Sequence, residues 1–425
     1  MEKIVQLKGE KETLQEGELE KLIRMANHRD KGKRPTQEEE TSPLPRIVDF
    51  LIGVAIKRRV SDIHIEPQED GVLVRNRIDG ILRNFHLLPK FLQAPLISRI
   101  KILANMDITE KRLPQDGRIK ASFSGRKLDL RISAIPTLYG EKVVLRLLDV
   151  EATSIPLEGI GFSTDIYEKI ISLIEKPQGV IFITGPTGSG KTSTLYACLN
   201  RIKSENINII TLEDPIEYEM KGTTQIAINE KIGLTFAEVL RSVLRQDPDV
   251  IMVGEMRDVE TARIALQASL TGHLVFSTLH TNDSVSAITR LLDMGIPPYL
   301  ITSSLSGVFA QRLVRVICPQ CKESYQPSME ELIQLGITPQ DDFDPLYQGK
   351  GCNYCDFTGF YGRVGIFELF ILDDEIRTLI NSGASESLIR NKVQAKGMQP
   401  LLKDGLRKIK EGKTTIKEVL RVAKR

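Results

Sequence analysis

One segment of the chain has the residue types and the spacing of a phosphate-binding loop. Residues 185–192 read G-P-T-G-S-G-K-T, which matches the pattern G-x-x-x-x-G-K-[ST]. Glycines let the backbone close around a phosphate, Lys191 can reach the β- and γ-phosphates, and the hydroxyl of Thr192 can bind magnesium. A predicted buried strand (179–184) precedes this segment and a predicted helix (192–203) follows it, so a plain glycine turn is the weaker interpretation. The candidate nucleotide-binding residues are Gly185, Pro186, Thr187, Gly188, Ser189, Gly190, Lys191, Thr192 and Ser193.

Two acidic residues end predicted strands further along the chain. Glu255 follows the apolar segment 249–253, and such a strand in a P-loop sheet brings its carboxylate to magnesium or to the attacking water. Glu213 ends the segment 207–213, and we expect it and Asp214 to be exposed at the carboxyl edge of the sheet, where α/β proteins bind ligands. A strand end that is acidic only for solubility is the alternative for each.

Two of the five histidines flank the predicted strand 273–279. His280 opens a polar segment that leaves this strand, which is a position suited to sensing a phosphate, and His273 stands at its start. The alternative is a structural role, because a lone histidine usually satisfies local hydrogen bonds.

Four of the five cysteines form two C-x-x-C pairs, Cys318 with Cys321 and Cys352 with Cys355, whereas Cys198 stands alone. Thirty residues separate the pairs, and this spacing suits the closed tetrahedral thiolate site of a structural zinc ion. Four unrelated buried thiols are the alternative.

Two arginines lie inside predicted strands of a basic segment. Residues 44–150 carry 19 Lys and Arg against 12 Asp and Glu, a net charge of about +7 that acidic residues elsewhere conceal. Most of these cations suit a solvated face. Arg131 and Arg146, however, stand in apolar-rich strands, where side chains alternate between faces, and an arginine held on a rigid strand is suited to meet a fixed anion.

The elements that must position these residues follow from composition and pattern. The chain has 425 residues and a formal net charge of +2, which predicts two to three soluble domains and disfavours a histone-like protein. No signal peptide and no apolar run of about 18 residues is evident, so we expect a cytoplasmic location. Hairpin-like strands before residue 150 predict an α+β domain with an antiparallel sheet. Strands that alternate with helices up to about residue 312 predict a parallel sheet covered by helices.

Several ordered motifs resemble those of the secretion ATPase superfamily of type II secretion and type IV pilus assembly. They are the segments 61–67, 113–118, 185–192, 211–215, 253–258 and 271–280. By this resemblance the family's Walker A motif falls on 185–192, its aspartate box on 211–218, its Walker B motif on 249–255 and its histidine box on 271–283. The resemblance covers about residues 43–425. Residues 1–42 lie outside it, and their charged composition predicts a flexible or partner-ordered arm. For the rest of the chain, pattern and resemblance together predict a basic, PAS-like α+β domain (43–150), a linker (151–162), a RecA-like ATPase core (163–314), a tetracysteine zinc module (315–368) and a helical C-terminal region (369–425).

The resemblance also implies roles for residues. Arg131 and Arg146, with Arg118 as a weaker candidate, would meet the γ-phosphate. One of Glu255 and Glu213 would polarise the attacking water while the other helps to hold magnesium, and we favour Glu255 for the water. Lys191, His273 and His280 complete the predicted catalytic set.

The predicted function is a homohexameric motor that hydrolyses ATP with Mg²⁺, carries Zn²⁺, and drives pilin or pseudopilin assembly through a membrane platform protein. It would work at the cytoplasmic face of the inner membrane. Relatives that retract pili lack the tetracysteine module, so its presence favours assembly or secretion. Only about 40 residues precede the basic domain in this sequence, so we do not expect in it the folded recruitment domain that many secretion and pilus-extension relatives carry. The alternatives are a DNA-translocating motor, disfavoured by near-neutral charge and 5% aromatic residues, and a nucleotide-gated scaffold without turnover.

Overall fold

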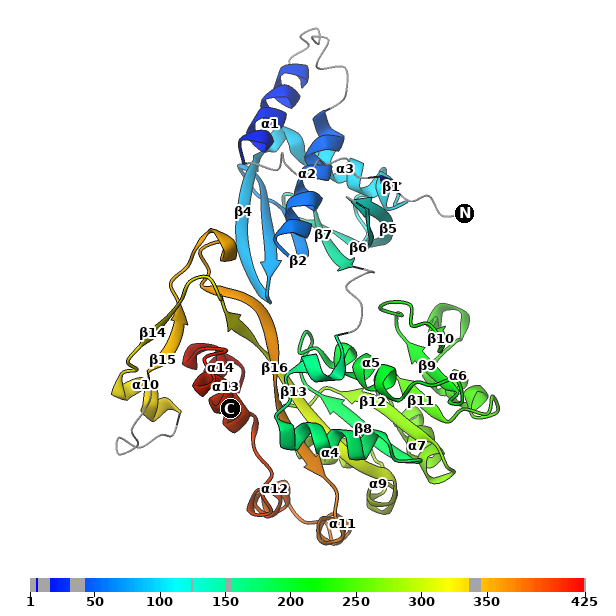
Figure 1. The fold of residues 1–425 in the computed structure, drawn as a ribbon. Coiled ribbons are helices and arrows are strands. Elements are labelled where there is room, and N and C mark those ends of the chain that lie inside the picture. Colours follow the sequence, from blue (N-terminus) through cyan, green and yellow to red (C-terminus); the bar gives the residue numbers. More distant parts are fainter. Residues whose placement is uncertain are drawn as a thin grey trace. The chain divides into compact units, whose positions relative to one another are not determined.

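The computed structural model describes residues 5–6, 16–30, 43–123, 125–149, 155–335 and 345–423 (Figure 1). The chain divides into two compact units, Met1–Thr153 and Ser154–Arg425. Within the described ranges, no helix is both long enough and apolar enough to cross a membrane.

Unit 1 is a seven-stranded sheet in the order β1-β5-β6-β7-β2-β3-β4, antiparallel except that β1 runs parallel to β5. This arrangement confirms the predicted α+β domain with an antiparallel sheet. Its elements are α1 (Glu16–Asp30), α2 (Pro43–Lys57), α3 (Gln93–Leu103), β1 (Val5–Gln6), β2 (Val60–Pro67), β3 (Gly71–Ile78), β4 (Ile81–Pro89), β5 (Gln115–Phe123), β6 (Arg126–Thr137) and β7 (Gly140–Asp149).

The helices of unit 1 pack on one face of this sheet. Leu130 and Ile132 of β6 are buried in the shared core, and Arg131 between them lies on the opposite face because side chains alternate along a strand. The segment expected to be a flexible arm differs in part from that prediction. Residues 16–30 form α1, and its Leu19 and Leu22 are buried in the same core, so this part of the arm gains its order from burial against α2.

Unit 2 is built on a second seven-stranded sheet in the order β10-β9-β11-β12-β8-β13-β16, which is parallel except for β16. Strand β8 follows α4 and leads directly into the glycine-rich loop. The core elements are α4 (Thr164–Ile174), β8 (Gly179–Thr184), α5 (Lys191–Ile202), β9 (Ile209–Glu213), β10 (Thr224–Ala227), α6 (Phe236–Val243), β11 (Val250–Val253), α7 (Val259–Leu270), β12 (Leu274–Leu279), α8 (Ser286–Asp293), α9 (Pro298–Ser304), β13 (Leu305–Ile317) and β16 (Phe360–Ile371).

Helices cover both faces of this sheet, as the alternation of strands and helices predicts. On β8, Val180 and Phe182 face the cluster that includes α6 to α9, whereas Ile181 and Ile183 face α4 and α5. A parallel strand buried on both faces reads as a continuous apolar run, and β8 is buried over its whole length.

The boundaries near the cysteines differ from those predicted. Strand β16 pairs with β13 over most of its length, so residues assigned to the zinc module belong to the core sheet. The cysteine-bearing segment is an insertion between these two strands. It contains β14 (Lys322–Tyr325), α10 (Met329–Gln334) and β15 (Leu346–Gly349), and the C-terminal region then adds α11 (Asp374–Asn381), α12 (Glu386–Ala395), α13 (Leu401–Lys410) and α14 (Ile416–Ala423).

Candidate active site

The glycine-rich loop joins the carboxyl end of β8 to the start of α5. Gly185 has φ +152°, and a Cβ there would lie 2.5 Å from the carbonyl oxygen of Gln311, so only glycine fits. Gly190 occupies the N-cap of α5 in the left-handed region and brings no capping side chain. The first amide groups of α5 therefore face the loop, as they do in helix-terminal phosphate sites. The hydroxyl of Ser189 is buried without a hydrogen-bond partner among the described residues, which fits a loop that receives a polar ligand.

Lys191 lies folded over this loop. Its Nζ donates hydrogen bonds to the carbonyl oxygens of Gly185 (2.7 Å) and Pro186 (3.2 Å). Burial lowers the pKa of Lys191 to about 8, while the charge of Glu255 acts in the opposite direction. The ammonium group is thus held at the loop with little negative charge nearby to balance its positive charge. A bound phosphate would supply that negative charge.

Glu255 stands two residues beyond β11, at the same carboxyl edge of the sheet. Its side chain is 23% exposed, forms an ion pair with Arg257, and places one oxygen 3.5 Å from Nε2 of His280. Arg257 also donates a hydrogen bond to Asp214 (3.1 Å). The structure therefore brings Glu255 and His280 together near Lys191. Arg257 lies within the segment 253–258, which carries part of the family resemblance, but the sequence does not reveal its role. Its contact with Glu255, which orients that carboxylate, is seen only in the structure.

Glu213 lies in a different environment from the one expected. Asp214 is exposed, as predicted, but Glu213 is only 3% exposed, which corrects the prediction that both carboxylates reach solvent. Its carboxylate accepts hydrogen bonds from Tyr196 of α5, from Thr211 (2.6 Å) and from Gln225 of β10 (3.1 Å). Burial and then the hydrogen bond to Glu213 raise the pKa of Tyr196. Tyr196 and Gln225 escaped sequence reasoning because α5 and β10 meet β9 only in the folded protein, whereas Thr211 lies two residues before Glu213 on the same strand.

The two histidines lie at opposite ends of β12. His280 follows the carboxyl end of β12, beside Glu255, and its side chain is half exposed. His273 precedes the amino end, where its Nδ1 lies 2.8 Å from the carbonyl oxygen of Ala268. Because β12 runs parallel to β8, His273 is at the edge remote from the glycine-rich loop. The structure does not bring it to the other predicted catalytic residues.

Three arginines of unit 1 form a row across adjacent strands. Arg118 of β5 pairs in register with Arg131 of β6, which pairs in turn with Arg146 of β7. Directly opposed residues of antiparallel strands share a face, so the three side chains lie on the face away from the helices. Nε of Arg118 donates to Asp129 (2.6 Å) and Nε of Arg146 to Asp62 (3.0 Å). The side chains of Arg118 and Arg146 remain more than half exposed, which leaves them able to meet an anion.

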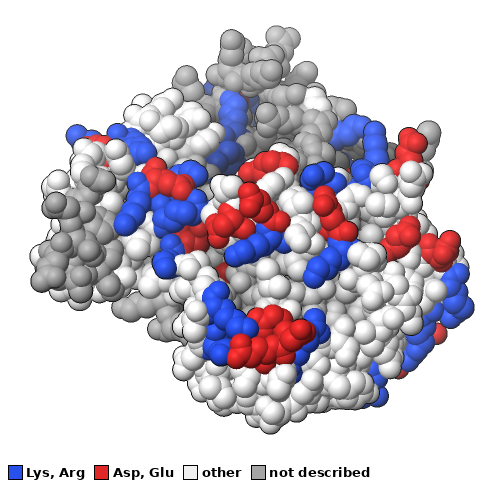
Figure 2. All heavy atoms as spheres, turned by 60° about the horizontal axis from the view of Figure 1, so that its bottom comes forward, with Lys and Arg blue, Asp and Glu red and all other residues white. Residues whose placement is uncertain are grey.

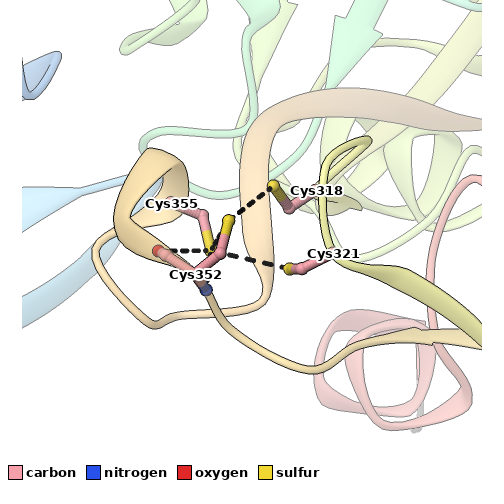
Figure 3. A group of neighbouring side chains, drawn as sticks. All are labelled: Cys318, Cys321, Cys352 and Cys355. Atoms are coloured by element: carbon pink, nitrogen blue, oxygen red, sulfur yellow. Dashed lines mark hydrogen bonds between the residues drawn. The ribbon is translucent and has the colours of Figure 1, made fainter.

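The four paired cysteines converge on one point (Figure 3). Their Sγ atoms all lie within 4.8 Å of one another, and the distances from Cys318 to Cys352, from Cys321 to Cys355 and from Cys352 to Cys355 are 3.9, 3.8 and 3.7 Å. A tetrahedron of sulfurs around zinc, with Zn–S bonds of about 2.3 Å, has edges of about 3.8 Å. The spacing therefore fits zinc and is too long for disulfides.

Backbone groups around the cysteines also suit thiolate ligands. The amide of Gly351 points to Cys321 (3.2 Å), and those of Cys352 and Gly359 point to Cys355 (both 3.3 Å). Burial alone would raise the pKa of Cys355, but hydrogen bonds from these two amides and from neighbouring thiols lower it to about 6. Such amide-to-sulfur contacts orient and stabilise metal-bound thiolates.

This fold and site define a P-loop ATPase with a RecA-like core: a parallel sheet, a glycine-rich loop with Lys191 after one strand, and Glu255 after a second.

Comparisons with known proteins support this class. The family model described as "Type II/IV secretion system protein" matches residues 37–421. Type II secretion system protein HxcR of Pseudomonas aeruginosa is 49% identical over 386 residues, which cover 91% of this chain and 78% of that protein. Type IV pilus assembly ATPase PilB of Thermus thermophilus is 48% identical over 398 residues, covering 92% of this chain and 45% of PilB.

Solved structures give the same fold. The pilus retraction motor PilT with bound ADP is 27% identical, with a TM-score of 0.59, and the match covers 88% of this chain and 96% of PilT. The Legionella pneumophila ATPase DotB, at 22% identity and a TM-score of 0.65 over 92% of this chain and 97% of DotB, supports the fold alone. The chain belongs to the type II/IV secretion system protein family, which confirms the resemblance drawn from its motifs.

Proposed function

We propose that this protein is a motor ATPase that powers assembly of pilins or pseudopilins for type II secretion or type IV pilus extension. The observation that carries the proposal is the convergence of Lys191, on the glycine-rich loop, and Glu255 at one edge of the core sheet. Family membership supports the link to secretion or pilus assembly.

The two acids take different roles in this proposal. Glu255 is partly exposed and close enough to Lys191 to affect its pKa, so it polarises the attacking water. Glu213 is buried and already accepts three hydrogen bonds, so it positions the loop edge rather than meeting water directly. ATP would be held by residues 185–193, and Mg²⁺ by the Thr192 hydroxyl together with the nucleotide phosphates. Magnesium would neutralise charge that develops on the phosphates.

The arginine row of unit 1 has a role in this proposal that the family resemblance suggests. We propose that Arg131 and Arg146 contact the γ-phosphate, with Arg118 in support, in a homohexamer whose subunits each have both units. Arg118 and Arg146 are paired with Asp129 and Asp62 but remain more than half exposed, so the row can still attract a polyanion. Loss of the γ-phosphate on hydrolysis would weaken this contact and so change the orientation of the two units.

The cysteine cluster would hold one Zn²⁺ in a structural role. All four ligand positions are occupied by sulfur, so no open position is left for water or substrate. Zinc would fix the insertion between β13 and β16.

We also propose that the motor acts through an inner-membrane platform protein, at the cytoplasmic face of that membrane.

A DNA-translocating motor is the second candidate, and charge disfavours it. On the face that Figure 2 presents, basic and acidic side chains lie beside one another in small groups, and neither sign forms a continuous band. Single-strand binding also needs aromatic side chains for base stacking, and this chain has no tryptophan. Stimulation of ATP hydrolysis by DNA would favour this candidate.

ATP hydrolysis by the purified protein tests the proposal. We expect measurable turnover with Mg²⁺ that falls by about 100-fold or more in Glu255→Gln, because the amide cannot accept the proton of the attacking water. ATP binding should persist in that variant. Glu205→Gln, which changes an exposed acid of the same unit, is the control and should keep wild-type turnover. A wild-type protein that binds ATP without turnover would instead support a nucleotide-gated scaffold.

A further inference from the structure

Arg312 is a buried cation on β13 that the motifs do not account for. As a whole residue, Arg312 is only 8% exposed. The guanidinium donates hydrogen bonds to two main-chain carbonyl oxygens, that of Gln311 (2.9 Å) and that of Asn282 (2.6 Å). Among the residues that the structure describes, no carboxylate oxygen lies within the 4.0 Å of an ion pair with it. Burying a charge without a directly paired charge is costly, so such an arginine calls for a role.

The nearest acids are engaged elsewhere. Asp283 and Glu368 both act on the pKa of Arg312, which burial lowers. Asp283, however, forms an ion pair with Arg390 (2.9 Å), and Glu368 accepts a hydrogen bond from the amide of Ser284 (2.9 Å). The charge of Arg312 is therefore compensated only at a distance.

Arg312 lies against the start of the phosphate-binding loop. Ala310 pairs in register with Thr184, the last residue of β8, so Arg312 extends two residues beyond the strand that leads into the loop. A Cβ added to Gly185 would lie 3.0 Å from Nη1 of Arg312. Its charge also reaches Lys191, whose pKa it lowers.

The hydrogen bond to Asn282 connects this position to the polar segment after β12. That segment also carries His280, which lies beside Glu255. On the other face of β13, the side chain of Gln311 accepts a hydrogen bond from Thr194 of α5 (2.7 Å). Neighbouring side chains of β13 thus contact the segment after β12 on one side and helix α5 on the other, because side chains alternate between faces.

We propose that Arg312 is a positioning residue for ATP hydrolysis, which ties the first residue of the phosphate-binding loop to the segment that carries His280. Nucleotide-dependent movement at Gly185 is then transmitted within one subunit to the histidine and to Glu255. This inference rests on the proposed function, because it assumes that the loop binds ATP.

Arg312→Gln tests the inference in the full-length protein, with Arg312→Lys as a second variant and Arg377→Gln, which changes a partly exposed arginine of α11, as the control. We expect Arg312→Gln to lower kcat by about 10-fold or more while the Kd for Mg²⁺-ADP changes by less than about 3-fold. Arg312 reaches the two carbonyl oxygens with two separate nitrogens of a rigid planar group, Nη1 and Nη2. Arg312→Lys keeps the charge but offers a single, flexible ammonium nitrogen in place of that fixed geometry, so it should restore less than about half of kcat. The control should match the wild type.

A binding measurement separates this inference from the proposed function. The shift of the thermal unfolding midpoint by Mg²⁺-AMP-PNP should differ from the shift by Mg²⁺-ADP in the wild type, and this difference should disappear in both Arg312 variants. Wild-type kcat in Arg312→Gln, equal losses of kcat and ADP binding, or full rescue by lysine would overturn the inference. A wild type that binds both nucleotides without turnover would remove the proposed function, and the midpoint comparison would still decide the role of Arg312.

Discussion

Tyr196 of α5 donates a hydrogen bond to Glu213 of β9, and both side chains are buried. Helix α5 begins at Lys191, so this bond links the helix that receives the phosphates to the acid of the neighbouring strand. A carboxylate that accepts three hydrogen bonds in a buried site is held in one position, and its ability to move depends on those donors. Nucleotide binding at the start of α5 can therefore change the position of the Glu213 carboxylate without direct contact between the nucleotide and Glu213.

Tyr196→Phe removes one of these donors while it keeps the ring that packs edge-on against Tyr218. The buried carboxylate then loses one of its three donors and keeps those of Thr211 and Gln225, and we expect the free energy of unfolding to fall by about 1–2 kcal/mol. Turnover should fall several-fold with little change in ADP affinity. Tyr218→Phe is the matched control, because the hydroxyl of Tyr218 makes no described bond to Glu213. Equal kcat values in the wild type and Tyr196→Phe would refute the coupling between this bond and hydrolysis.

Local sequence patterns predict much of this site, and tertiary contacts explain where they fail. The glycine-rich loop, Glu255 and the cysteine pairs are contiguous or regularly spaced, so their chemistry can be read along the chain. The burial of Glu213 depends on Tyr196 and Gln225, which approach it only when α5 and β10 pack beside β9. Nothing in the local pattern around Glu213 distinguishes an exposed strand end from a carboxylate covered by other elements.

Strand β16 illustrates the same limit for the fold. It follows the second cysteine pair in sequence, so proximity along the chain assigns it to the zinc module. In the structure it pairs with β13, from which the whole cysteine insertion separates it. Strand pairing across such an insertion depends on the apolar faces that both strands bury, and a single segment does not reveal its partner.

The arginine row predicts a selective defect in hydrolysis. Arg131→Ala and Arg146→Ala should each lower kcat by about 10-fold or more, because a charged contact to the γ-phosphate is lost while ADP lacks that group. ADP affinity, measured by calorimetry, should change by less than about 3-fold. Arg112→Ala removes an exposed arginine of the same unit and should leave both quantities unchanged. Equal losses of hydrolysis and ADP binding would argue against γ-phosphate recognition.

The cysteine cluster predicts a stoichiometric metal. The wild type should contain about one zinc per chain by elemental analysis, and Cys352→Ser should contain clearly less, because one of four thiolate ligands is removed. We also expect proteolysis within residues 315–368 to become faster in that variant. Cys198→Ala, which removes the lone buried cysteine of α5, should keep its zinc. A Cys352→Ser protein with full zinc content and unchanged proteolysis would contradict a four-sulfur site.

The lowered pKa of Lys191 predicts how nucleotide affinity depends on pH. In the nucleotide-free protein this pKa is about 8, and phosphate oxygens must raise it in the complex. Below pH 8 the lysine is already charged, so this group leaves affinity unchanged. Above pH 8 binding requires proton uptake, and affinity for Mg²⁺-ADP should fall by up to about tenfold per pH unit until the pKa of the complex is reached.

Calorimetry at pH 7, 8 and 9 in buffers of different ionisation enthalpy measures both the affinity and the proton uptake. Lys191→Arg stays charged over this range, so its remaining affinity for Mg²⁺-ADP should lack this dependence on pH.

The lowered pKa of Lys191 also affects the stability of the folded protein. A lysine whose pKa is lowered on folding destabilises the free protein most below pH 8, and this cost is relieved as the pH rises from about 8 towards 10.5. Lys191→Met should therefore unfold at a higher temperature than the wild type at pH 7 without nucleotide, and the difference should shrink at pH 10. An ADP affinity of the wild type that stays constant from pH 7 to pH 9, with no proton uptake, would contradict the assignment of this pKa to the phosphate-binding lysine.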